Sequence, residues 1–245
     1  MSKQEVSLAL NGVSVTYSDK PVIKDINLEL YSGETFGLMG LNGAGKTTMI
    51  KSILGLRDQD EGEILIYGKD KSDPASKSRL SFLPEKFEPP WFLTGMEFME
   101  FCFQLYKQPF NKDDVITAAE SLSLDTAALK RRMNTYSKGM RQKLGLMGTL
   151  LMDCSLFILD EPMSGLDPRA RALVKKMMNE IKHKERTIFL SSHILADMDE
   201  ICDRVAVLHN NKIMFVGEPA ELKALTNADN LEQAYLEYIE NKDVV

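Results

Sequence analysis

Hydrophobic and polar positions alternate along the first third of the chain, which is the pattern of strands that bury one face. Apolar residues occur at about every second position in 6–17 and again in 26–30. A glycine turn then leads into an apolar strand at 35–39. The period becomes helical over 46–54 and stops at Gly55. The sequence therefore predicts an antiparallel layer, followed by a strand, a glycine-rich loop and a helix.

The middle of the chain changes character. Short strands are predicted at 63–67 and 79–83, and a cluster of prolines after them marks a boundary. Residues 86–147 have helical periodicity, and Thr94 with Glu97 predicts a capping box at the first helix of this segment. We therefore expect a helical insert between two parts of an α/β pattern.

The last third returns to strands and helices. Unbroken apolar runs at 156–159 and 187–190 flank a helix predicted at 168–184, which is the pattern of buried parallel strands joined by a crossover. A closing hairpin is predicted from strands at 204–208 and 213–216.

These elements predict one α/β domain over residues 1–245, in which 44% hydrophobic residues supply a core. Its parts are a catalytic core formed by 1–85 and 148–230, a helical subdomain at 86–147 and a C-terminal helix within 231–245. The C-terminal helix has two open interpretations, which are packing on the core and support of dimerisation.

Composition excludes several classes of function. The net charge of −6 is spread along the chain without a basic stripe, so we expect no direct nucleic-acid binding. Three widely spaced cysteines, Cys102, Cys154 and Cys202, suit buried thiols in a reducing compartment. The most apolar stretch, 144–152, is far shorter than the roughly 20 residues that span a bilayer, and the N-terminus does not resemble a signal peptide. We expect a cytoplasmic protein that does not enter a membrane on its own.

The strongest chemical signal is the segment GLNGAGKTT at 40–48. Glycines let backbone amides turn toward phosphate oxygens, Lys46 can reach the β and γ phosphates, Thr47 can hold magnesium, and the following helix adds its dipole. The alternative is a tight turn with an exposed lysine, which the flanking strand and helix disfavour. The sequence therefore predicts a site for a nucleoside triphosphate with Mg²⁺. The residues expected to form it are Gly40, Leu41, Asn42, Gly43, Ala44, Gly45, Lys46, Thr47 and Thr48.

Two acidic residues follow the apolar run at 156–159. Asp160 ends this predicted strand, where it would hold Mg²⁺ through water, and Glu161 is the candidate base for an attacking water. An isolated Asp-Glu-Pro sequence would merely begin a loop, but beside a phosphate loop the catalytic interpretation is favoured.

The motifs, in this order, resemble the nucleotide-binding subunits of ATP-binding-cassette (ABC) transporters over nearly the whole chain. Residues 136–142, YSKGMRQ, occupy the slot of a signature close to LSGGQ, and 164–167, SGLD, that of a loop close to SALD. His193 follows the next strand, as the histidine of that family does. The resemblance implies a P-loop NTPase fold with a RecA-like core, an N-terminal antiparallel β layer and an inserted α-helical subdomain, with ATP and Mg²⁺ as ligands.

The signature segment offers a second phosphate-binding surface. Ser137 and Gly139 at a helix N-terminus provide a hydroxyl, a free amide and a positive dipole end, although Ser137 alone would be a helix cap. Lys138 adds positive charge beside them. One chain cannot easily apply both surfaces to one ATP, and the resemblance implies that a second copy pairs head to tail with the first.

Three further roles come from the resemblance. It implies that His193 senses the γ-phosphate, that Asp167 contacts nucleotide as well as capping a helix, and that Tyr17 stacks on adenine. For Tyr17, a strand aromatic in the core is the alternative.

The chain departs from the family pattern in two places. Lys138 and Met140 replace a glycine and a glutamine of the signature, and Glu85 replaces a glutamine, which leaves Glu85 as a weaker candidate for Mg²⁺. The sequences YSKGM at 136–140 and FLPE at 82–85 resemble those of the single-domain ATPases of ABC-2-type exporters. Asn111 to Asp114 matches a guanine-reading motif but does not follow a strand, so Asn111 is better interpreted as a helix cap and adenine as the base.

The leading hypothesis is an ATP-hydrolysing subunit that powers a separate integral membrane permease, peripheral to the inner face of the membrane. Aromatic residues at the start of the insert would then form a groove for the permease or, equally, a subdomain core; they are Phe87, Trp91, Phe92 and Phe98. A soluble ABC ATPase that works on a macromolecule is the alternative, although such proteins usually have two cassettes or a coiled-coil insert. A small-molecule kinase would lack the signature motifs.

Overall fold

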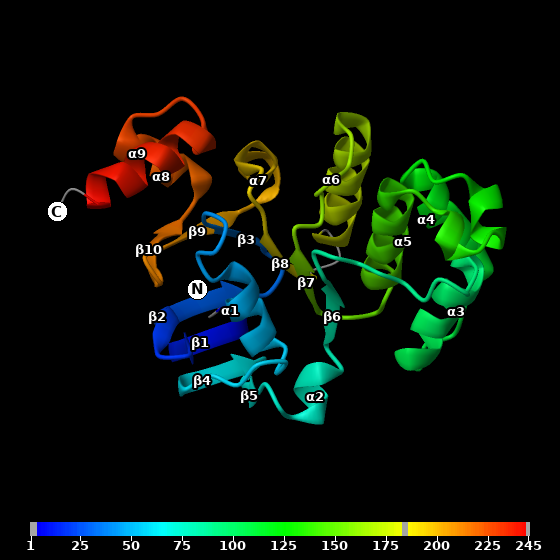
Figure 1. The fold of residues 1–245 in the computed structure, drawn as a ribbon, viewed down its shortest axis with the longest axis horizontal. Helices are drawn as coiled ribbons and strands as arrows, with labels where there is room; N and C mark the ends of the chain where they lie inside the picture. The colour runs from blue at the N-terminus through cyan, green and yellow to red at the C-terminus, as the bar shows by residue number, and fades with distance from the viewer. Residues whose placement is uncertain (1–3, 183–185, 244–245) are drawn as a thin grey trace.

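The computed structural model describes residues 4–182 and 186–243. The predicted antiparallel layer is present as a four-stranded sheet in the order β2-β1-β4-β5 (Figure 1). Its strands are β1 (Val6–Tyr17), β2 (Lys20–Tyr31), β4 (Glu61–Ile66) and β5 (Lys69–Asp70). Leu8, Leu10 and Val13 lie buried on one face, as the alternating pattern predicted.

A second sheet of six strands has the order β10-β9-β3-β8-β7-β6, and its pairs from β9 to β6 are parallel. Strand β10 pairs antiparallel to β9 at one edge. The carboxyl ends of the parallel strands meet at one edge of the sheet, where ligands bind in open α/β folds. The strands are β3 (Thr35–Met39), β6 (Leu80–Leu83), β7 (Leu156–Asp160), β8 (Thr187–Ser191), β9 (Arg204–His209) and β10 (Lys212–Gly217).

The unbroken apolar runs are buried because both faces of this sheet are covered. On one face, Leu156 and Ile158 join a core that includes α1 (Lys46–Ile53) and the antiparallel layer. On the other, Phe157 and Leu159 join a core with α5 (Lys138–Leu150), α6 (Pro168–Lys182) and α7 (Leu195–Ile201). Figure 1 shows α1 between the two sheets and α6 and α7 on the opposite side. The fold is thus that of a P-loop NTPase.

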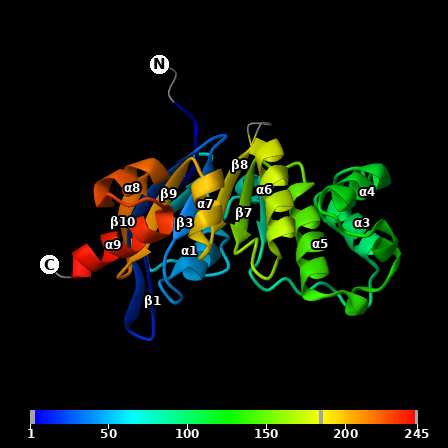
Figure 2. The ribbon, with the colours of Figure 1, turned by 90° about the horizontal axis from the view of Figure 1, so that it is seen from above.

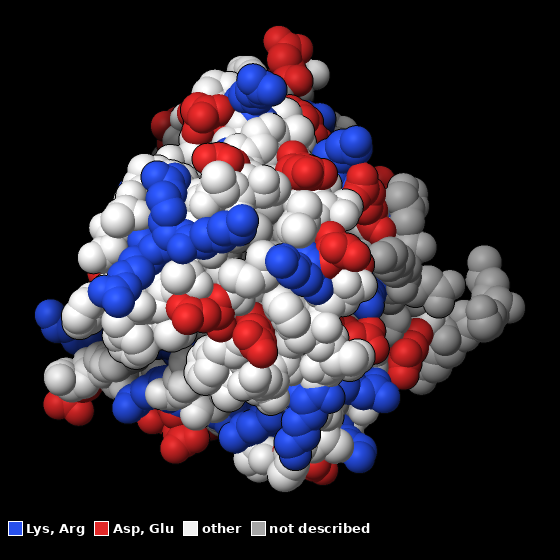
Figure 3. All heavy atoms as spheres, turned by 90° about the vertical axis from the view of Figure 1, so that its right-hand side faces the viewer, with Lys and Arg blue, Asp and Glu red and all other residues white. Residues whose placement is uncertain are grey.

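The helical segment extends away from the sheets beyond α5 (Figure 2). It contains α3 (Gly95–Leu105), α4 (Lys112–Ser121) and two short 3₁₀ turns, Thr126–Lys130 and Met133–Thr135. Both predicted caps are confirmed. Thr94 and Glu97 form a capping box on α3, and the Asn111 side chain accepts from Asp113 N on α4. On the face that this segment presents, acidic and basic side chains are interspersed (Figure 3).

The aromatic group at the start of the insert divides in two. Phe98 is buried and Phe87 packs on it edge to face, with ring centroids 5.5 Å apart. Trp91 and Phe92 are 66% and 57% exposed. The core interpretation therefore holds for one pair, while the other pair lies on the surface.

The C-terminal segment forms α8 (Pro219–Thr226) and α9 (Leu231–Asp243), and α9 packs against α7 and α8. Leu231, Ala234 and Tyr235 are buried there, so the interpretation that this helix packs on the core is confirmed. Residues 183 and 184 of the predicted crossover helix and residues 244–245 lie outside the described residues. Within the described part, no helix is both long and apolar enough to cross a bilayer.

Four short elements were absent from the predicted pattern: α2 (Pro74–Lys77), β5, α7 and α8. None has more than eight residues, and segments this short often lack a recognisable period. The three cysteines are buried free thiols, as expected. Burial raises the pKa of Cys102 and Cys154 to about 12, so neither thiol ionises near neutral pH.

Gly62 tests how closely the antiparallel strands approach. Its φ is +81°, and an added Cβ would lie 2.4 Å from the Asn11 carbonyl oxygen. Gly68 has a similar φ of +73° with no atom within 4 Å of its Cβ position. Both alanine variants share the cost of left-handed backbone, about 1–2 kcal/mol. In urea titrations, we expect Gly62→Ala to lose about 2 kcal/mol more free energy of unfolding than Gly68→Ala, because the backbone at Asn11 must move to make room for the new methyl group. Equal losses would contradict this packing.

Candidate nucleotide-binding and catalytic site

The glycine loop at 40–48 connects β3 to α1 at the carboxyl edge of the parallel sheet. Gly45 has a φ of +111°, and a Cβ there would lie 2.8 Å from both Ile23 Cγ2 and the Val22 carbonyl oxygen. A Cβ on Gly40 would meet the Leu208 carbonyl oxygen at 2.8 Å. Only glycine fits these two positions, because the loop is held against β2 and β9.

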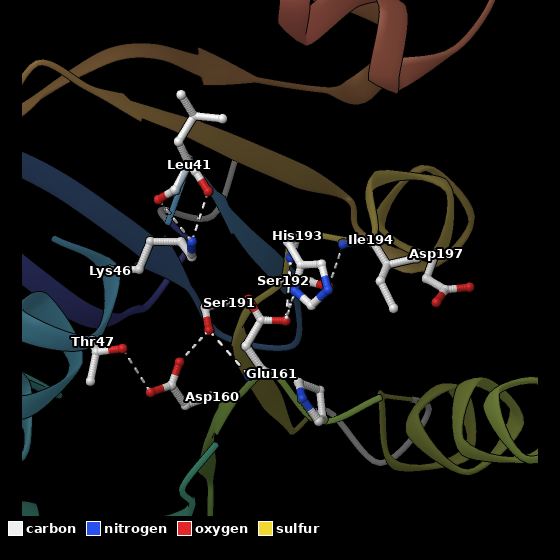
Figure 4. A network of polar contacts seen from close by, with 12 residues as sticks. Leu41, Lys46, Thr47, Asp160, Glu161, Ser191, Ser192, His193, Ile194 and Asp197 are labelled. Atoms are coloured by element: carbon white, nitrogen blue, oxygen red, sulfur yellow. Dashed lines mark hydrogen bonds and ion pairs between the residues drawn. The ribbon is translucent and has the colours of Figure 1, made fainter. Parts of the chain in front are cut away.

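Lys46 points back into this loop and is only 7% exposed. Its Nζ donates to the Gly40 carbonyl oxygen at 2.7 Å and to that of Leu41 at 3.3 Å (Figure 4). Burial lowers the pKa of Lys46, while the carboxylates of Glu161, Asp160 and Glu85 oppose that shift. The ammonium group is thus held by carbonyl oxygens at the point where phosphate oxygens would replace them.

Asp160 is 3% exposed at the end of β7. Its Oδ2 accepts from Thr47 Oγ1 at 3.2 Å, and its Oδ1 accepts from Ser191 Oγ at 2.5 Å. Mg²⁺ prefers oxygen ligands and is usually bound by one or two carboxylates together with substrate phosphates. The Thr47 hydroxyl and the Asp160 carboxylate fit this ion, and Glu85 lines the same cavity.

Ser191 was not among the predicted site residues. It lies directly opposite Asp160 in the parallel β7–β8 ladder, which explains its contact with that carboxylate. Its Oγ also accepts from the Glu161 amide at 3.2 Å. The signal that could have found it was its place at the end of the second apolar run, matching the place of Asp160 at the end of the first.

Glu161 has a strained backbone. Its φ is +52°, and Pro162 follows it, which further restricts its conformation. A non-glycine residue held in a sparsely populated region costs about 1–3 kcal/mol, and such residues cluster at functional sites. Its Oε2 lies 2.7 Å from His193 Nδ1 and accepts from the His193 amide at 3.3 Å. Strand ends β7 and β8 therefore bring the predicted base and the predicted sensor together.

A cavity of about 400 Å³ joins these groups. It is lined by Val22, Asn42, Gly43, Gly45, Lys46, Thr47, Thr48, Glu85, Asp160, Glu161 and His193. Tyr17 is not among the lining residues. It is 42% exposed, with the Arg57 guanidinium 4.8 Å from its ring centroid, so the interpretation of Tyr17 as a core aromatic is wrong.

The signature residues lie outside this cavity. Ser137 caps α5 by accepting from Met140 N at 3.2 Å, and Lys138 and Gly139 begin the helix. Asp167 Oδ1 accepts from Ala170 N at 2.9 Å, so its predicted capping of α6 is confirmed. The structure thus assembles the glycine loop with the acidic residues and leaves the α5 N-terminus apart from them.

Comparisons with known proteins agree with this geometry. A match to the family described as ABC transporter covers residues 23–164. The ABC-type transporter ATP-binding protein EcsA of Bacillus subtilis is 33% identical over 238 residues, which are 94% of this chain and 95% of that protein. The Nod factor export ATP-binding protein I of Sinorhizobium fredii is 34% identical over 227 residues, 90% of this chain and 65% of that protein.

A solved structure described as the ATP-binding subunit of an ABC transporter superposes with a TM-score of 0.85 at 30% identity, covering 94% of this chain and 98% of that one. The chain spans between 57% and 65% of the length of several curated relatives that it matches, the Nod factor protein among them.

Lys46 and Lys51 provide a matched test on one helix, because Lys51 is exposed on α1 and Lys46 is buried in the loop. We expect Lys46→Ala to weaken binding of Mg²⁺-ATP about tenfold or more, because the variant loses a charge-assisted hydrogen bond to phosphate. Lys51→Ala should bind as the wild type does. Titration with a fluorescent ATP analogue measures both, and undiminished affinity in Lys46→Ala would refute the assignment of the loop.

Proposed function

The chain belongs to the ABC transporter family and carries its nucleotide-binding ATPase domain, and we propose that it powers a separate integral membrane permease through ATP-driven pairing with a second copy of itself. The proposed location is the inner face of the cell membrane, held there by the permease. Export is the proposed direction. It is supported by the sequence YSKGM in the signature segment and by the similarity to the Nod factor export ATP-binding protein I.

One observation carries the pairing. The phosphate loop and the start of α5 are both built to hold anions, yet Ser137, Lys138 and Gly139 do not line the cavity of the phosphate loop. A single ATP therefore contacts both surfaces only when the α5 N-terminus comes from another molecule. Head-to-tail pairing of two copies satisfies this requirement twice.

The proposed mechanism assigns each cavity residue a task. Lys46 exchanges its two carbonyl partners for the β and γ phosphate oxygens, which costs little because the ammonium is already desolvated. Thr47 and Asp160 would hold Mg²⁺, which neutralises charge on the phosphates. Glu161 accepts a proton from the attacking water, and His193 orients that water toward the γ-phosphate. Loss of phosphate then lets the copies separate.

Glu161→Gln separates binding from hydrolysis. The amide keeps the size of the side chain but cannot accept the proton, so we expect ATP turnover to fall about 100-fold or more with ATP binding retained. A dimer should accumulate with Mg²⁺-ATP, as measured by sedimentation. Glu180→Gln, on the exposed side of α6, is the control. Turnover at the wild-type rate in Glu161→Gln would exclude Glu161 as the base.

The surface pair Trp91 and Phe92 is the proposed contact for the permease. The two rings meet edge to face with centroids 5.7 Å apart, and Trp91 lines a hollow of about 490 Å³ with Glu85, Phe87 and Asn134. Large exposed aromatics beside a hollow are typical of protein interaction sites. Glu85 lines both this hollow and the nucleotide cavity, which would connect the two sites.

Substitution of both rings tests the permease contact and the alternative function together. Where an integral membrane protein encoded by an adjacent gene co-purifies with the wild-type chain, we expect Trp91→Ser with Phe92→Ser to abolish that co-purification, while ATP binding stays unchanged. Leu225→Ser, equally exposed on α8, should keep the complex. A wild-type chain that forms no complex with that membrane protein would favour the soluble ABC ATPase.

A further inference from the structure

A buried side chain connects the start of α5 to the loop that carries Glu161. Gln142 is 5% exposed, and its Nε2 donates to the Pro162 carbonyl oxygen at 2.9 Å. Pro162 directly follows Glu161, and Gln142 lies about one turn along α5 from Gly139. Gln142 and Pro162 are 20 positions apart in the chain, so their hydrogen bond is a tertiary contact between the helical segment and the catalytic core.

Two packing contacts accompany this hydrogen bond. A Cβ on Gly165 would lie 3.0 Å from Lys138 Cε, so the Lys138 side chain lies across the backbone of Gly165. A Cβ on Gly139 would lie 3.9 Å from Leu166 Cδ2. The first turns of α5 therefore lie against the loop at 162–166, which the side chains of Lys138 and Gln142 reach and beside which Gly139 leaves room for Leu166.

The loop needs such support because Glu161 is strained. Strained backbone persists only where the surroundings over-determine it. On one side, Ser191 accepts from the Glu161 amide through both its carbonyl and its hydroxyl oxygen, each at 3.2 Å. Within the loop, Ser164 N donates to the Glu161 carbonyl oxygen at 3.1 Å. On the other side, Gln142 donates a hydrogen bond to the Pro162 carbonyl oxygen, and this support comes from α5 rather than from the sheet.

We propose that Gln142 is a positioning residue. It orients Glu161 according to whether the α5 N-terminus is bound to ATP. The inference rests on the proposed function, in which Ser137, Lys138 and Gly139 bind the ATP held by the second copy. Gln142 then connects that ATP, in one site of the dimer, to the catalytic base of the other site. The two sites are coupled through one helix and one hydrogen bond.

Gln142→Met tests the coupling, because methionine keeps the length of the side chain but cannot donate. Lys143→Met is the matched control, since Lys143 Nζ donates to the Ser123 carbonyl oxygen at 3.1 Å from the neighbouring position of the same helix. We expect Gln142→Met to lower kcat for ATP hydrolysis about tenfold with the ATP KM within about twofold, and to lower the Hill coefficient for ATP toward one. Gln142→Glu, which also lacks the donor, should do the same.

Thermal unfolding and binding of a fluorescent ATP analogue establish that each variant is folded. The proposal is overturned if kcat falls only in proportion to folded protein, or if it matches the Lys143→Met value. A reduced kcat with an unchanged Hill coefficient would overturn the coupling between sites. A wild-type chain that hydrolyses no ATP, alone or with its permease, would contradict the proposed function itself, and the inference would fall with it.

Discussion

The register between β7 and β8 is the constraint on which the site depends. Alternate residues of β7 face two different cores, with Leu156 and Ile158 on one side and Phe157 and Leu159 on the other. A slip of one residue would exchange these faces, so burial on both sides fixes the pairing. The same ladder places Asp160 opposite Ser191. Thr47, Glu161 and His193 then reach Asp160 or one another from chain segments that begin or end at this edge.

The packing that stabilises the sheet offsets the cost of two unfavourable features at its edge, a buried charge and a strained backbone. Lys46 is a buried cation, and Glu161 has a strained backbone before a proline. Each costs stability on its own, and each is held by hydrogen bonds to backbone atoms of neighbouring strands and loops. Local cost with surrounding support is the usual arrangement of a functional site. The hydrogen bonds of Ser191 and Gln142 support this strained segment, and neither residue is among those proposed to act on ATP.

Sequence patterns predicted most of the fold because its central elements have strong local signals. The unbroken apolar runs, the glycine loop and the capping box at Thr94 each depend on residues close together in the chain. No motif assigned a role to Ser191 or Gln142, and their contacts with Asp160 and Pro162, 31 and 20 residues away, become visible only in the fold. Tyr17 and the pair Trp91 and Phe92 show a second limit. An aromatic residue in an apolar pattern has the same sequence signal whether it is buried or exposed.

The carbonyl contacts of Lys46 have a consequence for the thermodynamics of binding. The carbonyl oxygens of Gly40 and Leu41 hold the ammonium group in place, and Gly45 packs the loop against β2. The backbone that would receive the phosphates is therefore ordered in advance, and little conformational entropy is lost when they arrive. In the proposed head-to-tail pair, the entropy that remains to be lost is that of joining two molecules, so subunit concentration, rather than loop folding, would set how readily the complete site forms.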